Sequence, residues 1–386
     1  MTPPLTYLDQ AATGYPKPRE TIDEMRFYQQ YIGGNPGRGG HSAAREAAKL
    51  VYDCRQALAA LFGGESERIF FTLNTTYALN MILKSTLQKG DRVLLSDLEH
   101  NALLRPALAL REKGVAVDFF ETDLLDPART VRNAAAAIRA DTKMLACTAA
   151  SNVLPVRLPL RELGKLCGES GVFFTVDGAQ GGGHFPISVK DCAIDALCLP
   201  GHKGLFGVTG CGVGILSPRL AAFLTERPTC VEGGSGSQSL LSDMPKEFPD
   251  RLEAGTLPVL PIAGLLGGLR FLEKAGKKIE SKEKRLYRGF REILLREKKV
   301  KLYLPEAETG SLLLFEIRDI DPSAAASAFD EYGVCLRDGL HCAPLAHRKI
   351  GTVEKGALRL SFGATQDEND VDRFAAVLRR ICRNCA

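Results

Sequence analysis

Short apolar, β-rich runs alternate with helical patterns between residues 68 and 216. The apolar runs are continuous, which is typical of strands that are buried on both faces of a parallel sheet. We therefore predict an α/β fold with a mostly parallel sheet covered by helices on both faces, and such sheets bind ligands at the carboxyl ends of their strands. The predicted strands are 68–72, 92–96, 115–120, 143–148, 172–177, 195–200 and 211–217, with helices at 75–86, 102–113, 127–139 and 160–169.

Further helical patterns lie on either side of this region. We predict helices at 18–31 and 42–62 before the sheet, and at 259–275, 278–298 and 367–382 after it. Short strands at 303–305, 311–317, 334–336 and 357–362 predict a smaller α+β unit. The stretch 228–250 is rich in Gly, Ser and Pro and predicts a long functional loop. We expect an N-terminal segment at 1–15, a large domain at 16–257 and a small C-terminal domain at 258–386.

Composition limits the function classes. A net charge of +4 over 386 residues, without a dense Lys/Arg cluster, argues against nucleic-acid binding. The sequence contains no run of about 18 apolar residues, so it predicts no membrane span. The N-terminus shows no export signal, so we interpret the 11 cysteines as thiols in a reducing cytoplasm.

Lys203 and Asp177 each follow a predicted strand, 26 positions apart. Alone, each has a plainer interpretation, a loop lysine and a turn-capping aspartate. Together they match what pyridoxal phosphate needs, because it requires a Schiff-base lysine and a carboxylate that keeps the ring nitrogen protonated.

Three other strand ends carry suitable polar groups. Thr75 and Thr76 precede a predicted helix, whose N-terminal amides favour a phosphate. His100 follows the strand 92–96, where an imidazole can stack on a flat ring, and Asn152 follows 143–148. Gln180 lies three residues after Asp177. These positions converge on one pyridoxal phosphate site.

Cys342 differs from the cysteines in apolar runs because it lies in a polar loop, next to His341 and near Arg337. Neighbouring cations raise the thiolate fraction of a cysteine, so we predict a reactive thiol. In the strand 357–362, Arg359 alternates with apolar residues and is a candidate ligand for a substrate carboxylate.

Taken in order along the chain, these motifs resemble those of the cysteine desulfurases, in the class V aminotransferase group with the fold-type I pyridoxal phosphate architecture and its seven-stranded sheet. The short cysteine loop resembles the group II branch, which includes selenocysteine lyase-like members. The matching segments are LDQAAT (8–13), NPGRGGH (35–41), NTT (74–76), EH-x-A (99–102), SNV (151–153), VDGAQ (176–180), GHK (201–203), EAGT (253–256), R-x-G-x-HCA (337–343) and the RLSF arginine.

The resemblance implies roles for these residues. Lys203 would hold the cofactor and move protons, and Cys342 would take the sulfur of L-cysteine as a persulfide while L-alanine leaves. It also implies a homodimer that shares its active sites, and a sulfur-acceptor protein. The implied cofactor ligands are Thr75, Thr76, His100, Asn152, Asp177, Gln180, His202, Lys203 and Thr256 of the partner subunit, and the implied substrate ligands are Asn152, Arg359, Arg38 and Ala11.

Two departures from the family pattern leave the substrate and the acceptor open. Pro200 stands where the family often has serine, and Asn101 where group II members often have a second histidine. The alternatives are a selenocysteine lyase, a C–S lyase, an aminotransferase or an epimerase of the same fold. A non-enzymatic thiol- or metal-handling protein would be signalled by Cys382 and Cys385, but one C-x-x-C pair at a helix end does not predict a metal site.

Overall fold

The computed structural model describes residues 5–37, 39–307 and 310–384. Its largest sheet has seven strands in the order β2-β8-β7-β6-β5-β3-β4. Strands β4, β3, β5, β6 and β7 run parallel, and β8 is antiparallel to both β7 and β2. The predicted α/β fold with a mostly parallel seven-stranded sheet is confirmed. The strands are β2 (Ile69–Thr72), β3 (Arg92–Ser96), β4 (Ala116–Phe120), β5 (Thr142–Thr148), β6 (Phe173–Asp177), β7 (Ala196–Pro200) and β8 (Gly212–Leu216).

Helices cover both faces of this sheet, and consecutive strand residues point into different cores. Cys147 and Leu197 pack into the core under α2, α5, α6 and α8, whereas Ala146 and Cys198 pack into the core under α3, α4 and α7. Both faces of the central strands are therefore apolar, which explains their continuous apolar runs. The helices are α2 (Ser42–Phe62), α3 (Thr75–Thr86), α4 (Asn101–Ala109), α5 (Pro127–Ala137), α6 (Leu160–Glu169), α7 (Pro218–Thr225) and α8 (Val259–Ala275).

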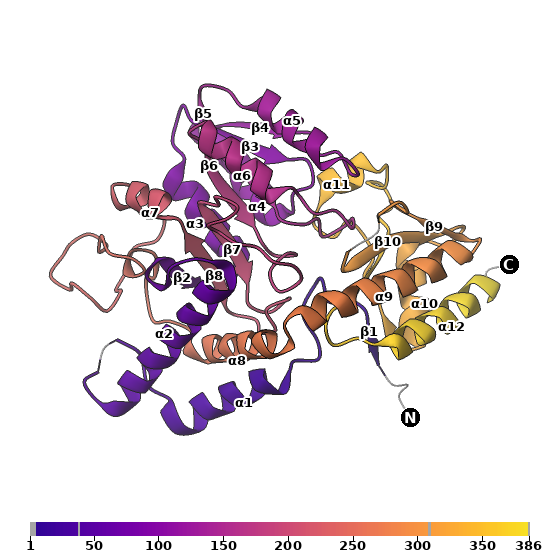
Figure 1. Ribbon diagram of the computed structural model, residues 1–386, viewed down its shortest axis with the longest axis horizontal. Coiled ribbons are helices and arrows are strands. Elements are labelled where there is room, and N and C mark those ends of the chain that lie inside the picture. The colour runs from indigo at the N-terminus through magenta and orange to yellow at the C-terminus, as the bar shows by residue number, and fades with distance from the viewer. Residues whose placement is uncertain (1–4, 38, 308–309, 385–386) are drawn as a thin grey trace.

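A smaller unit lies beside the large one (Figure 1). Its antiparallel sheet has the order β12-β10-β9, and helices α9, α10 and α12 contribute to a core that contains Phe290, Phe315 and Phe374. The N-terminal strand β1 pairs in parallel with β11 of this unit. The elements are β1 (Thr6–Tyr7), α9 (Lys277–Arg296), β9 (Val300–Leu302), β10 (Leu312–Ile317), α10 (Pro322–Glu331), β11 (Val334–Cys335), α11 (Pro344–Lys349), β12 (Leu358–Ser361) and α12 (Glu368–Asn384).

One predicted strand is wrong. The strand expected at 303–305 lies earlier, at β9, where Val300 pairs with Ile317 of β10. The ladder ends because Leu304 has a φ of 52° and Pro305 has no amide hydrogen to donate. The sequence prediction followed the apolar letters of YLP and overlooked the alternation of Val300 and Leu302.

Helix α8 packs against α2 and against α1 (Arg19–Phe27), which continues as a π-helical turn, Tyr28–Ile32. Its apolar residues belong to a core of the large unit, and α9 continues from its end into the small unit (Figure 1). The chain thus passes from the large unit to the small one through α8 and α9, and the 257/258 boundary expected from the sequence stays a prediction. As predicted, 228–249 contains neither helix nor strand.

Candidate active site

A cavity of about 190 Å³ lies at the carboxyl edge of the large sheet. Its walls come from the segments that follow β2, β3, β5, β6 and β7, the five strand ends singled out in the sequence. Every residue expected to hold the cofactor lines it except Thr256, which is exposed elsewhere. The residues brought together are Thr75, Thr76, His100, Asn152, Asp177, Gln180, His202 and Lys203.

Lys203 and Asp177 line the same cavity and influence each other electrostatically. Asp177 is the last residue of β6, and its Oδ1 accepts a hydrogen bond from the amide of Ala179 at 3.0 Å. Burial lowers the pKa of Lys203 to about 8, although the charge of Asp177 opposes this shift. A partly neutral amine is a nucleophile, so the site favours attack by Lys203 on an aldehyde.

The N-terminus of α3 forms another wall. Asn74 caps this 12-residue helix by accepting a hydrogen bond from the amide of Tyr77 at 3.0 Å. Thr75 Oγ1 is buried and has no hydrogen-bond partner among the described residues. A buried hydroxyl without a partner beside free helix-terminal amides fits an anion such as phosphate.

Strand β8 passes directly below this wall. A Cβ atom at Gly212 would lie 2.3 Å from the carbonyl carbon of Asn74, so only glycine allows this approach. Glycine at this position lets β8 pair with β2 while the turn at Asn74 stays in place.

His202 also lines the cavity. Its Nδ1 and Thr13 Oγ1 are 3.1 Å apart, and its carbonyl accepts from Lys17 Nζ at 2.8 Å. Burial, then the charges of Lys203 and Lys17, lower the pKa of His202 to about 4, so the ring is neutral at neutral pH. Pro200, which replaces the family's serine, also lines the cavity and offers no hydroxyl.

These features fit pyridoxal phosphate. The unpartnered hydroxyl of Thr75 suits its phosphate, the amine of Lys203 suits its aldehyde, and the buried carboxylate of Asp177 suits its cationic ring nitrogen. Burial raises the pKa of Asp177, and a bound cation would oppose that effect.

His100 caps α4 through its ring. Its Nδ1 accepts a hydrogen bond from the amide of Ala102 at 2.9 Å. Burial, followed by the charges of Lys203 and Arg337, lowers its pKa to about 4. The neutral ring therefore carries its proton on Nε2, and its plane is fixed by the helix it caps.

Glu99 is a residue that the sequence analysis did not single out. It is fully buried, its Oε1 accepts from the amide of Thr148 at 3.0 Å and from the Ser96 hydroxyl, and burial raises its pKa to about 8. These hydrogen bonds join the ends of β3 and β5 at the residue that precedes His100. The Glu in EH-x-A was the available signal, but its burial depends on the fold.

Arg359, on β12, is buried and already has partners. Its Nη2 donates to Asp9 Oδ1 at 2.6 Å and its Nη1 to the carbonyl of Asn152 at 3.0 Å. Its Nε is buried without a partner among the described residues. The sequence analysis did not single out Asp9, although it lies in the LDQAAT segment. Arg359 is close to the cavity through Asn152 but is not one of its lining residues.

The remaining predicted substrate ligands have different outcomes. Ala11 is buried, its amide donates to Ser361 Oγ at 2.9 Å, and its carbonyl accepts from Gln180 Nε2 at 3.0 Å. It therefore orients Gln180 at the cavity wall. Arg38 lies outside the described residues.

Cys342 is exposed, in the turn between β11 and α11, and its loop is joined to the cavity by hydrogen bonds. The amide of Asn101 donates to the Cys342 carbonyl at 2.7 Å, and Asn152 Nδ2 donates to the His341 carbonyl at 2.6 Å. The loop bearing the predicted nucleophile thus rests on two segments beside the cavity. Asn101, noted as a departure, is one of them.

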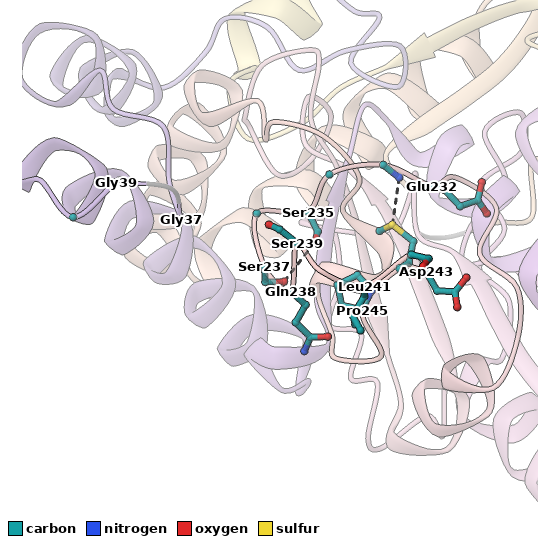
Figure 2. A pocket seen from close by; sticks show the side chains of 16 residues that line it. Gly37, Gly39, Glu232, Ser235, Ser237, Gln238, Ser239, Leu241, Asp243 and Pro245 are labelled. Atoms are coloured by element: carbon teal, nitrogen blue, oxygen red, sulfur yellow. Dashed lines mark hydrogen bonds between the residues drawn. The ribbon is translucent and has the colours of Figure 1, made fainter.

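A larger cavity, of about 810 Å³, lies between Gly37, Gly39 and Gly40 on one side and the segment 232–245 on the other. Figure 2 shows that its serine side chains come from that segment and that glycines form the facing wall. Its described lining residues include neither a lysine nor a histidine. Within the described ranges, no group of three or more His, Cys, Asp or Glu residues is arranged to hold a metal ion. No helix in the described part of the chain has the length and apolar character needed to cross a membrane.

Comparison with known proteins places this geometry in context. The Aminotransferase class-V family profile matches residues 6–374. A probable cysteine desulfurase from Pyrococcus abyssi is 30% identical over 398 residues, covering 100% of this chain and 96% of that protein. A cysteine desulfurase from Serratia proteamaculans is 32% identical, covering 98% of this chain and 93% of that protein.

Solved structures show the same similarity. The apo cysteine desulfurase from Thermococcus onnurineus NA1 superposes with a TM-score of 0.88 at 27% identity, covering 98% of this chain and 95% of that chain. The Escherichia coli cysteine desulfurase CsdA, in an S-sulfonic acid form, gives a TM-score of 0.87 at 26% identity with the same coverage.

Proposed function

The chain belongs to the cysteine desulfurases of the class V aminotransferase family, and on that premise we propose that it converts L-cysteine to L-alanine with pyridoxal phosphate and keeps the sulfur as a persulfide on Cys342. One observation carries the proposal. The exposed cysteine loop is hydrogen-bonded, through Asn101 and Asn152, to the segments that line the cavity containing Lys203 and Asp177.

We assign the cofactor contacts to the residues that line the cavity. Thr75, Thr76 and His202 would hold the phosphate, Lys203 the aldehyde carbon, and Asp177 the ring nitrogen. When bound, the cofactor supplies an electron-withdrawing ring that stabilises the charge left when the substrate loses its Cα proton. His100, fixed as the cap of α4, would lie against the ring face.

The chain's own groups perform the remaining steps. Arg359 Nε, which has no partner among the described residues, would bind the substrate carboxylate. Lys203 takes the Cα proton because its pKa, about 8, leaves part of it neutral. The Cys342 thiolate attacks the substrate sulfur, an S–S bond forms, and the Cβ–S bond breaks. The electron pair of that bond stays on Cβ, which takes up a proton, so L-cysteine and the thiol become L-alanine and the persulfide.

We also propose that two copies of the chain form the active unit and that a second protein accepts the sulfur. Thr256 is exposed and lies outside its own chain's cavity, so it is available to a neighbouring copy. Leu240 and Leu241 in the 228–249 segment are exposed apolar residues. Sedimentation of the holoprotein tests the dimer, and a monomer would refute it.

The function is tested by incubating the holoprotein anaerobically with L-cysteine and measuring alanine, pyruvate and protein-bound persulfide. We expect one alanine per persulfide, and a loss of about a hundredfold or more in Cys342→Ala. Cys192→Ala, which removes another partly exposed thiol, is the matched control and should keep its activity. Pyruvate formation that survives in Cys342→Ala would instead identify a C–S lyase.

Borohydride reduction followed by peptide mapping tests the cofactor separately from activity. The reduced adduct should lie on the peptide that contains Lys203 and should be absent in Lys203→Ala. An adduct on another lysine would refute the assignment.

A further inference from the structure

His341 and Cys342 both adopt the left-handed backbone conformation, with φ angles of 51° and 56°. Residues with a Cβ rarely adopt this conformation, and two in succession persist only when surrounding contacts hold them. The contacts from Asn101 and Asn152 hold the two carbonyls, but they do not fix the His341 side chain.

A second histidine holds that side chain. His341 and His347 are both buried, with 3% and 0% of their surfaces exposed, and their rings are stacked 5.4 Å apart at 13°. His341 Nδ1 and His347 Nε2 are 3.2 Å apart. At the two ends of this pair, His341 Nε2 lies 3.3 Å from the Arg337 carbonyl, and His347 Nδ1 lies 2.7 Å from Thr352 Oγ1.

The Arg337 carbonyl, His341, His347 and Thr352 form a row of hydrogen-bonded groups, and the chemistry of each group determines which of them donates. Burial lowers the pKa of His341 to about 2 and that of His347 to about 4, so each neutral ring carries one proton. The Arg337 carbonyl only accepts, so the proton of His341 is on Nε2 and its Nδ1 accepts. His347 must then donate from Nε2, and its Nδ1 accepts from the Thr352 hydroxyl.

The helix that carries His347 is held to the large unit by an ion pair. His347 lies on α11, whose Lys349 forms an ion pair with Asp97 at 2.7 Å, in the segment that leads from β3 to His100. The donor at His347 therefore reaches the cysteine loop from an element fixed to the large unit.

We propose that His347 is a positioning residue for Cys342: by donating from Nε2 to His341 Nδ1, it keeps the cysteine loop in the conformation that presents the thiol to the substrate sulfur. The proposal rests on the proposed function. An apolar side chain of similar size would fill the same space but would not donate, so packing and positioning are separable.

Two variants and two substrates test the proposal in the holoprotein. His347→Leu removes the donor, whereas His347→Gln keeps an amide donor and an acceptor. L-selenocysteine is the matched control substrate, because selenium leaves more readily and depends less on the thiol. We expect His347→Leu to lose about tenfold to a hundredfold in alanine formation from L-cysteine, to stay within about twofold on L-selenocysteine, and to be largely rescued in His347→Gln.

A parallel loss on both substrates, or an unchanged rate on L-cysteine, would overturn the proposal. Failure of the function itself would look different, since the wild type would then make no alanine from L-cysteine.

Two measurements decide the positioning role without activity. Nitrogen-15 NMR of labelled histidines should show both His341 and His347 protonated on Nε2, and a proton on His347 Nδ1 would refute the direction of the chain. Hydrogen exchange at the Asn101 amide, which donates to the Cys342 carbonyl, should be faster in His347→Leu and restored in His347→Gln. If the Asn101 amide exchanged equally slowly in His347→Leu and in the wild type, His347 would not hold the cysteine loop.

Discussion

Asp9 and Arg359, 350 positions apart in the chain, form an ion pair in which the buried Arg359 donates from Nη2 to Oδ1 of the partly exposed Asp9 at 2.6 Å. This pair joins the N-terminal segment to the last strand of the small sheet, because Asp9 also bridges Ser361 of β12. Asp9 and Asn152 hold the guanidinium through Nη2 and Nη1, and Nε has no partner among the described residues.

We predict that Asp9→Asn keeps the fold but weakens substrate binding. The variant leaves a buried guanidinium without its countercharge, which costs about 1–3 kcal/mol in the free energy of unfolding. The less constrained Arg359 should raise KM for L-cysteine more than it lowers kcat. Denaturant titration and steady-state kinetics measure the two effects, and an unchanged KM would contradict the positioning of Arg359 by Asp9.

We predict opposite effects of Thr75→Val on stability and on cofactor affinity. The apoprotein should gain about 1 kcal/mol, because a buried hydroxyl without a partner is replaced by a methyl group. Affinity for pyridoxal phosphate should fall about tenfold, the effect of one hydrogen bond to a charged group. Both are measured on apoprotein, by thermal unfolding and by fluorescence titration.

Thr86→Val is the matched control for this prediction. Thr86 lies at the other end of α3, and its buried hydroxyl also has no partner among the described residues. The substitution should stabilise the protein without changing cofactor affinity. A similar loss of affinity in both variants would show that Thr75 does not contact the phosphate.

The sequence predicted the cavity residues because each of them follows a strand. Asp177 ends β6 and Lys203 follows β7 by three residues, and parallel strands bring such positions to one edge of a sheet whatever the side chains pack against. Local order along the chain therefore determines this part of the site.

The parts of the site that the sequence did not predict depend on contacts that form only in the folded protein. Asp9 reaches Arg359 only after β1 pairs with β11, and His347 reaches His341 only because Pro344–Lys349 folds as a helix, which the sequence analysis did not predict. Six residues give too little periodicity for such a prediction. No local pattern marks the ion pair or the stacked imidazoles.

We predict that the amine of Lys203 in the apoprotein titrates near pH 8, because burial lowers its pKa to about 8. Removing the charge of Asp177 in Asp177→Asn should lower the midpoint further, since that carboxylate raises the pKa. Competitive acetylation with trace anhydride, read by peptide mass spectrometry across pH, gives the midpoint. A higher midpoint in Asp177→Asn would contradict the electrostatic coupling of the two residues.

Glu99 provides the last prediction, a pH dependence of stability. Its pKa in the folded protein is about 8 against an ordinary value of 4.5, because burial disfavours the carboxylate. Between these pH values the unfolded chain is ionised at this residue and the folded chain is protonated, so folding takes up a proton. The free energy of unfolding should therefore fall as pH rises, by at most about 1.4 kcal/mol per pH unit from this residue.

Glu99→Gln has no ionisable group at this position and keeps an oxygen that accepts from the amide of Thr148. Its stability relative to the wild type should increase steadily from about pH 4.5 to about pH 8, as measured by urea unfolding at several pH values. Glu112→Gln, which changes an exposed carboxylate on the segment Leu110–Lys113, is the control for general charge effects. A difference in the free energy of unfolding between Glu99→Gln and the wild type that did not change with pH would mean that Glu99 is ionised in the folded protein. The assignment of a protonated carboxyl group to Glu99 would then be wrong.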